Sequence, residues 1–268
     1  MHLHRAIGFG PPELYDPFLL LDDFRSDRPR DYLKGFPWHP HRGMETVTYV
    51  LRGEVEHGDS LGNRDVIAPG DVQWMSAGSG IIHQEMPKGD VDGAMHGFQL
   101  WVNLPAASKM TQPRYRGVKS SEIPKVTDAG GGTVQVIAGK VGGVTGPVRD
   151  VVTSPEYLDV SVPAGKAFTH RTPRGHTVFA YVIGGQGIFS PEGEQVIGDG
   201  HLVAFTEGEA VTVSAGAGPV RFLLISGRPI GEPIAWSGPI VMNTEDELRL
   251  AFEELDRGTF IKHAKGAG

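Results

Sequence analysis

The two most informative stretches of the chain are Phe36-Pro37-Trp38-His39-Pro40-His41 and Ile82-His83-Gln84-Glu85. Each stretch places two side chains of metal-ligand type two residues apart. In a β-strand, residues i and i+2 point to the same face, so each pair can point into the interior of one sheet or barrel. Together the stretches offer three imidazoles and a carboxylate. That is the ligand set of a transition-metal site and not the composition of a hydrophobic core.

Pro40 separates His39 from His41 and predicts the start or the edge of a strand, because proline cannot donate a hydrogen bond to a neighbouring strand. If the strand continues unbroken, Glu45 also faces inward and becomes a further candidate ligand. A single histidine usually has a structural role, but a buried group of this size without a metal would leave several polar side chains unpaired. Each would cost about 1–3 kcal/mol, so the pattern favours a metal site.

Nitrogen and oxygen ligands of this kind suit iron(II), manganese, nickel, cobalt, copper or zinc, and the residues alone do not choose among them. The chain contains no cysteine, which excludes disulfides, thiolate nucleophiles and cysteine-based zinc or iron–sulfur sites. With four protein ligands, a six-coordinate ion keeps two positions for water, dioxygen or a chelating substrate. A closed structural zinc site fits less well, because such sites usually use cysteine.

The size and charge of the chain define its general class. Its 268 residues suggest one large domain or two of ordinary size, and its 38 glycines and 20 prolines are spread out, as in folds with many turns between short strands. The net charge of −7 argues against direct binding of nucleic acid. No signal peptide and no apolar run of about 18 residues is present, so we expect a cytoplasmic protein without a membrane span.

Short strands bounded by turn residues are predicted along most of the chain. Two stretches also recur: Thr48-Tyr49-Val50-Leu51-Arg52-Gly53 aligns with Ala180-Tyr181-Val182-Ile183-Gly184-Gly185, and Val66-Ile67-Ala68-Pro69-Gly70-Asp71 aligns with Val196-Ile197-Gly198-Asp199-Gly200-His201. This repeat predicts a duplicated β-domain. The predicted strands cover residues 45–51, 66–68, 72–75, 97–102, 133–138, 157–162, 177–183, 202–205, 211–213 and 220–225.

The repeat alignment gives the second half no comparable metal site, although His170, His176 and His201 could gather there. The positions that match His39, His41, Glu45, His83 and Glu85 are Arg171, Pro173, Thr177, Val213 and Ala215. In the first half, His57 falls in a predicted hairpin loop over residues 54–64 and is most simply solvated.

One helix is predicted near the C-terminus. Thr244 and Glu247 form a capping box, and Gly258 is a suitable stop. The apolar face between them consists of Leu248, Ala251, Phe252 and Leu255. We therefore expect a metal-binding domain over residues 1–120 and a second domain over residues 121–268 that ends in this helix, with the connection near residues 108–129.

Several long stretches resemble the pirin family. They are the stretch from Gly35 to Tyr49, which contains the first histidine pair, and Pro69-Gly70-Asp71-Val72-Gln73-Trp74-Met75-Ser76-Ala77-Gly78-Ser79-Gly80-Ile81-Ile82-His83-Gln84-Glu85-Met86. Leu100-Trp101-Val102-Asn103-Leu104 and Gly238-Pro239-Ile240-Val241-Met242-Asn243-Thr244 extend the likeness over nearly the whole chain.

The resemblance implies an all-β bicupin: two tandem jelly-roll barrels, of which only the first holds a metal. The family's ligands fall on His39, His41, His83 and Glu85, with iron(II) as the expected ion. Glu45 would then lie beside the ligands without binding the metal. Family members are described as quercetin 2,3-dioxygenases, as nuclear transcription cofactors in animals, and as regulators of bacterial metabolism through protein contacts.

Two hypotheses follow, both for a monomer. In the first, a dioxygenase opens a small aromatic substrate of the flavonol type with O2, and Glu85 takes the substrate proton, with Glu45 as the reserve base. In the second, a regulatory protein binds partner proteins and uses the metal as a structural or redox-sensing element. Another cupin enzyme, such as a sugar-phosphate isomerase, is a third reading, because one fold hosts many chemistries.

Overall fold

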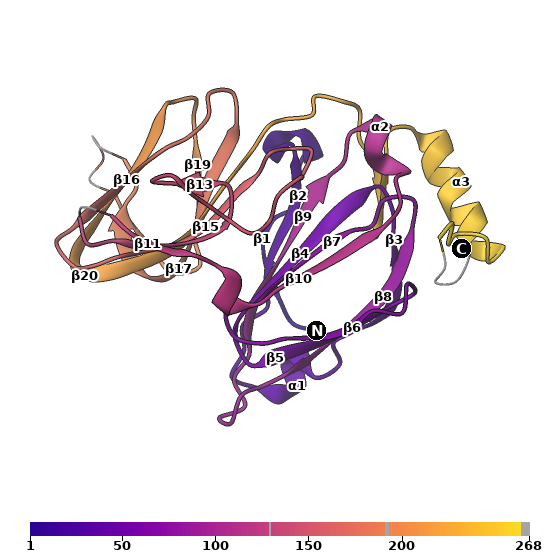
Figure 1. The fold of residues 1–268 in the computed structure, drawn as a ribbon, viewed down its shortest axis with the longest axis horizontal. Coiled ribbons are helices and arrows are strands. Elements are labelled where there is room, and N and C mark those ends of the chain that lie inside the picture. The colour runs from indigo at the N-terminus through magenta and orange to yellow at the C-terminus, as the bar shows by residue number, and fades with distance from the viewer. Residues whose placement is uncertain (129, 191–192, 194, 264–268) are drawn as a thin grey trace. The chain divides into compact units, whose positions relative to one another are not determined.

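The computed structural model describes residues 1–128, 130–190, 193 and 195–263. The chain forms two compact units, one made of Met1–Ser120 with the segment that begins at Ile230, the other of Ser121–Pro229. Figure 1 shows that each unit is built of strands, with few and short helices apart from the one near the C-terminus. The predicted all-β class is therefore confirmed.

The first unit contains two sheets that face each other. The larger has the strand order β1-β2-β9-β4-β7-β10, and the smaller has the order β3-β8-β5-β6. The inner faces meet, since Thr48 of β4 reaches Glu85 of β8. The strands are β1 His4–Ile7, β2 Phe18–Asp23, β3 Phe36–His41, β4 Met44–Arg52, β5 Glu54–Asp59, β6 Arg64–Ile67, β7 Val72–Ser76, β8 Ile81–Lys88, β9 His96–Asn103 and β10 Arg114–Val118.

The chain passes from one sheet to the other at Gly43, between β3 and β4. Gly43 has φ +78°, and a Cβ atom there would lie 1.9 Å from the carbonyl oxygen of Val241, so only glycine fits. The strand that carries His39 and His41 thus ends before Glu45. The expectation of an unbroken strand is wrong, whereas β3 does lie at a sheet edge, as Pro40 predicts.

The second unit consists mainly of an eight-stranded sheet with the order β11-β12-β15-β20-β17-β18, in which β16 pairs with β20 and β19 with β17. Its long strand β20 pairs with β15 at one end and with β16 at the other, so it turns the corner between two layers. The strands are β11 Lys125–Thr127, β12 Thr133–Ala138, β13 Lys140–Val141, β14 Val144–Thr145, β15 Glu156–Val162, β16 Ala167–Arg171, β17 Thr177–Ile188, β18 Val196–Gly198, β19 Leu202–Phe205 and β20 Ala210–Gly227.

The repeat seen in the sequence has a structural counterpart. In the first unit Val50 exchanges backbone hydrogen bonds with the segment at Gly70 and Asp71. In the second unit Val182 makes the same two bonds, to Gly200 and His201. The aligned stretches therefore have the same hydrogen-bonding role in the two units.

The C-terminal helix α3, Glu245–Asp256, begins with the predicted capping box of Thr244 and Glu247. Its buried face packs with the hairpin of β21 (Ala235–Ser237) and β22 (Ile240–Met242) and with Ile82 of β8. Figure 1 shows α3 beside β3 and β8. The sequence assigns this segment to the second domain. In the structure residues 230–263 pack with the first unit, because the apolar face of α3 is covered there.

Two short helices, α1 Pro29–Tyr32 and α2 Ala106–Lys109, and two 3₁₀ turns, Pro12–Tyr15 and Ser120–Glu122, complete the first unit and its exit. The expected connection over residues 108–129 is not a plain linker, since it supplies β10 to the first unit and β11 to the second. Within the described residues, no helix is long and apolar enough to cross a membrane.

Candidate metal centre

Three histidines meet between the two sheets of the first unit. His39 of β3 lies directly opposite His83 of β8, and His41 follows two residues later on the same face of β3. The ring centres are 4.4 Å apart for His39 and His83, 4.8 Å for His39 and His41, and 4.9 Å for His41 and His83. One potential ligand nitrogen from each ring lies within 4.8 Å of the others.

Backbone carbonyls hold two of these rings in position. The Nδ1 atom of His39 lies 2.7 Å from the carbonyl oxygen of Pro37, and Nδ1 of His41 lies 3.1 Å from that of Pro239. A carbonyl can only accept, so both rings carry their proton on Nδ1 and keep Nε2 for another partner. The two Nε2 atoms face each other at 3.0 Å.

His83 is buried, and neither of its ring nitrogens has a hydrogen-bond partner among the described residues. Burial, and then the neighbouring histidines, lower the pKa of His83 well below its ordinary value. Burial likewise lowers the pKa of His41, to about 3. Both rings are therefore neutral at physiological pH, which is the protonation state a metal ligand needs.

Glu85 lies on the same face of β8 as His83 and is also buried. Its two carboxylate oxygens accept hydrogen bonds of 2.6 Å from the hydroxyl of Thr48 and from the side-chain amide of Gln99. The structure thus places Glu85 inside the barrel but outside the three-histidine group. Its role as fourth ligand stays a prediction.

Glu45 is not brought to this centre. Thr48 points into the barrel, and Glu45 precedes it by three residues in a regular part of β4, so its side chain is on the opposite face. There it accepts hydrogen bonds from the indole of Trp74, at 3.0 Å, and from the hydroxyl of Ser76. The inward position expected for Glu45 depended on an unbroken strand from His39, and the corner at Gly43 removes it.

His57 is the residue that the sequence reasoning missed. It lies on β5 and is buried, not solvated in a loop; its ring centre is 5.5 Å from that of His83. Its Nε2 atom lies 3.1 Å from the carboxylate of Asp59, and its Nδ1 atom has no partner among the described residues. His57 and Asp59 have the same i, i+2 spacing as the two recognised pairs, and that spacing was the available signal.

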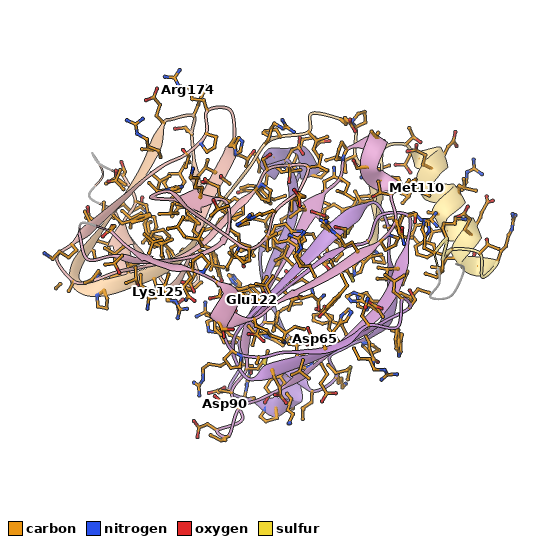
Figure 2. The ribbon with its side chains drawn as sticks, in the orientation of Figure 1. Asp65, Asp90, Met110, Glu122, Lys125 and Arg174 are labelled. Carbon is orange, nitrogen blue, oxygen red and sulfur yellow. The ribbon has the colours of Figure 1, made fainter. Side chains whose placement is uncertain are left out.

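The remaining inner wall is polar and aromatic. Tyr115 of β10 stacks on His57 at 4.7 Å, and its hydroxyl donates to Asp65, which Figure 2 labels. Trp101 meets His41 edge-on at 5.1 Å. The side-chain amide of Gln73 is buried beside Thr48 without a described partner. The interior of the first barrel therefore offers several unused hydrogen-bonding groups.

The second barrel has an apolar interior instead. Val213 and Ala215, which match His83 and Glu85 in the repeat, belong to its hydrophobic core. His170 lies 3.1 Å from Glu156, whereas His201 is exposed and contacts carbonyl oxygens of its own turn. Among the residues that the structure describes, the three-histidine group of the first barrel is the one cluster suited to a metal.

The donor set fits a transition metal. Two convergent Nε2 atoms and a third, unpartnered imidazole are costly to bury, because each unpaired polar group forfeits its hydrogen bonds with water. A divalent ion that accepts neutral nitrogen ligands would satisfy all three rings at once. The fold and this site define a class: a two-barrel cupin with a histidine cluster in its first barrel.

Comparison with known proteins identifies the group within that class. Residues 1–102 match the pirin family, and residues 157–261 match the pirin C-terminal cupin domain. The chain therefore belongs to the pirin family, as the sequence motifs predict.

Similar proteins include some that are named as dioxygenases and some that are named only for the family. A Pseudomonas aeruginosa protein named "putative quercetin 2,3-dioxygenase" is 44% identical over 96% of this chain and 91% of its own length. A pirin-like protein of Caulobacter vibrioides is 43% identical over 97% of this chain and 93% of its own. The crystal structure of a quercetin 2,3-dioxygenase from Acinetobacter baumannii matches with a TM-score of 0.86 and 32% identity, over 97% of this chain and 95% of that one.

Proposed function

We propose that the protein is a metal-dependent dioxygenase of the quercetin 2,3-dioxygenase type, which opens a flavonol-like aromatic substrate with O2. The observation that carries this proposal is the convergence of His39, His41 and His83 inside a barrel with an unsatisfied polar interior. The names of the similar proteins support the substrate class. In this proposal the three histidines and Glu85 hold one divalent transition metal, expected to be iron(II).

When bound, the ion would supply Lewis acidity that lowers the pKa of an enolic or phenolic hydroxyl. Glu85 would accept the proton of that hydroxyl. Each of its oxygens accepts one hydrogen bond, from Thr48 or Gln99, and a carboxylate oxygen can accept another. Trp101, edge-on to His41, would give a flat substrate an aromatic wall. The position of Glu45 does not support its role as reserve base.

The activity test uses protein purified without added metal and then loaded with iron(II). We expect quercetin to be consumed and oxygen to be taken up at equal rates. In His83→Ala both rates should fall at least about 100-fold. His201→Ala is the matched control, because His201 is exposed in the second unit, and it should keep full activity. Absence of turnover with iron, manganese, nickel, cobalt, copper and zinc, or full turnover in His83→Ala, would refute the proposal.

Stability gives a test of the metal that does not depend on turnover. His83 is buried with both nitrogens unpartnered, so His83→Leu should not destabilise the metal-free protein and should stabilise it by about 1 kcal/mol. The wild type should gain stability on addition of metal, and the variant should not. Urea unfolding with and without metal measures both. An equal gain in the two proteins would show that the ion binds elsewhere.

The regulatory hypothesis predicts a different pattern of results. A regulatory pirin would show stabilisation by metal that is lost in His83→Leu, yet no oxygen uptake with any of the six ions. It would also capture partner proteins in a way that depends on His39 and His41. The binding of partner proteins, the monomeric state and the cytoplasmic location all stay predictions.

A further inference from the structure

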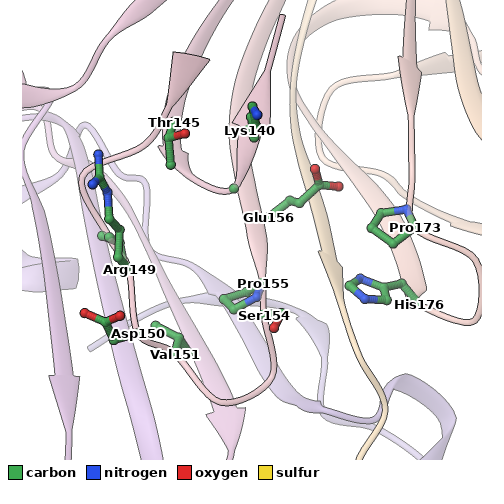
Figure 3. Close-up of a pocket in the computed structure, with 12 residues that line it drawn as sticks. Lys140, Thr145, Arg149, Asp150, Val151, Ser154, Pro155, Glu156, Pro173 and His176 are labelled. Atoms are coloured by element: carbon green, nitrogen blue, oxygen red, sulfur yellow. The ribbon is translucent and has the colours of Figure 1, made fainter. Parts of the chain in front are cut away.

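The second unit contains a pocket of about 450 Å³ that shares no lining residue with the metal centre. Figure 3 shows it between the β13–β14 hairpin and the segment that leads into β15, with Lys140, Arg149, Glu156 and His176 directed around it. All residues that line it belong to Ser121–Pro229. Its volume lies within the range of pockets that hold small organic ligands. We infer that this pocket binds a small organic monocarboxylate.

Two lining groups have unused capacity for a ligand. Lys140 is exposed at the rim and forms no ion pair within the described part of the chain. The Nδ1 atom of His176 is buried and has no hydrogen-bond partner among the described residues. A cation at one position and an unmatched ring nitrogen at another suit a ligand with an anionic end and a polar group at a distance from it.

Glu156 limits the ligand to a single negative charge. Its carboxylate is already satisfied, by Nε2 of His170 at 3.1 Å and by the hydroxyl of Ser226 at 2.8 Å, and it is largely buried. Figure 3 shows Glu156 directed toward the side of Pro173, away from Arg149. A second anionic group placed near His176 would face this fixed carboxylate, so the far end of the ligand must be neutral or a hydrogen-bond donor.

The body of the ligand is expected to be apolar. Val148, Val151, Pro155 and Pro173 also line the pocket. These side chains offer no hydrogen bonds, and they would cover an aromatic ring or a short hydrocarbon chain. A benzoate that carries a neutral hydroxyl at its far end combines the required features, and benzoate itself is the simplest probe that has the carboxylate and the ring.

The loop beside the pocket has an unusual backbone. Asp150 (φ 60°) and Ser154 (φ 47°) are the non-glycine residues with positive φ in the part of the chain that the structure describes, and both line this pocket. Such conformations are unfavourable for serine, and they cluster at ligand sites, where the surrounding structure maintains them. The strain supports a binding role for the loop.

The test is an NMR titration of the full-length ¹⁵N-labelled protein with sodium benzoate, and separately with inorganic phosphate. We expect saturable shifts of the amides of Thr145, Ser154 and His176 with benzoate, and weaker binding of phosphate. Lys140→Gln should weaken benzoate binding about tenfold, as loss of a charge-assisted hydrogen bond does. Lys166→Gln, an exposed lysine of the same unit outside the pocket, should bind like the wild type.

His176→Gln gives a second variant and should weaken the binding of 4-hydroxybenzoate, whose hydroxyl can donate to Nδ1 of His176 in the wild type. The inference fails if benzoate up to about 50 mM leaves these amides unshifted, since weaker binding would have no specificity. It also fails if Lys140→Gln binds as the wild type does, or if phosphate binds at least as well as benzoate. No residue of the first unit lines the pocket, so the result does not depend on the proposed dioxygenase activity.

Discussion

The Nδ1 atom of His41 lies 3.1 Å from the carbonyl oxygen of Pro239, although 198 residues separate the two in the sequence. This contact fixes the tautomer of a candidate metal ligand. It depends on the C-terminal segment, whose Val241 donates a backbone hydrogen bond to the carbonyl of Arg42. Residues 230–263 are therefore part of the first barrel's site as well as of its packing.

Arg42 is the first test of this relationship. Its buried guanidinium donates to the carbonyl oxygens of Ser79 and Phe260 and pairs with Glu254 at 2.8 Å, so it fastens α3 and the following residues to the barrel. We expect Arg42→Met to lower the free energy of unfolding by about 3 kcal/mol, because it leaves buried acceptors unpaired. Metal affinity should fall about tenfold, through loss of support for His41.

Urea unfolding and a metal titration measure the two effects of Arg42→Met. The control is Arg249→Gln, on the exposed face of α3, where ion pairs with Asp246 and Glu253 should contribute less than about 1 kcal/mol. If Arg42→Met lowers stability but leaves metal affinity unchanged, the C-terminal segment has no part in positioning His41.

Gln99 is expected to orient Glu85. It donates to one carboxylate oxygen of Glu85 at 2.6 Å and accepts from the indole of Trp101 at 3.1 Å. Removal of such a supporting hydrogen bond usually costs 10- to 100-fold in metal affinity or activity, and we expect a loss of about that size for Gln99→Leu. Gln135→Leu, which removes an amide bonded to Asp159 in the second unit, is the control. Equal metal affinity in both variants would argue against Glu85 as a ligand.

Lys109 should give the protein a measurable pH dependence. Its buried ammonium donates to the carbonyl oxygens of Gly43 and Val241 and to the side chain of Asn103. Desolvation lowers the pKa of Lys109 from 10.5 to about 8. Between these values the unfolded chain binds more protons than the folded protein, so the contribution of this site to stability rises with pH across the window.

We expect Lys109→Met to remove that rise. From pH 7.5 to pH 10, the free energy of unfolding of the wild type should gain about 2 kcal/mol relative to the variant, as measured by urea unfolding at each pH. Lys166→Met, at an exposed position, should follow the wild type. Parallel pH curves for Lys109→Met and the wild type would contradict the lowered pKa.

Glu45 should give a pH dependence of stability with the opposite sign. Burial raises the pKa of this carboxyl above its ordinary value of 4.5, despite hydrogen bonds from Ser76 and Trp74. The folded protein holds the proton more tightly than the unfolded chain does, so this group's contribution to stability falls as pH rises above about 4.5. Glu45→Gln should flatten that fall and leave metal affinity within about twofold of wild type, because the side chain faces away from the histidines. A tenfold loss of metal affinity would place Glu45 at the centre after all.

Several features of the fold and of the site could be predicted from local sequence patterns. The spacing of His39 with His41, and of His83 with Glu85, predicted which side chains share a face, because alternation along a strand follows from backbone geometry alone. The capping box at Thr244 was equally readable, since its hydrogen bonds span only three residues. The family motifs extended these local signals to the two-barrel fold.

Tertiary structure decided what depends on contacts between distant segments. Glu45 lies outside the site because the strand that carries His39 and His41 ends at the corner at Gly43, against which the carbonyl of Val241 packs. His57 lies beside the site because the segment expected to be a loop forms strand β5, which pairs with β8 and is part of the buried barrel wall. The tautomer of His41 depends on Pro239 in the same way. A sequence specifies alternation and capping residue by residue, but sheet exchange and ring orientation are fixed only when remote chain segments fill the remaining space.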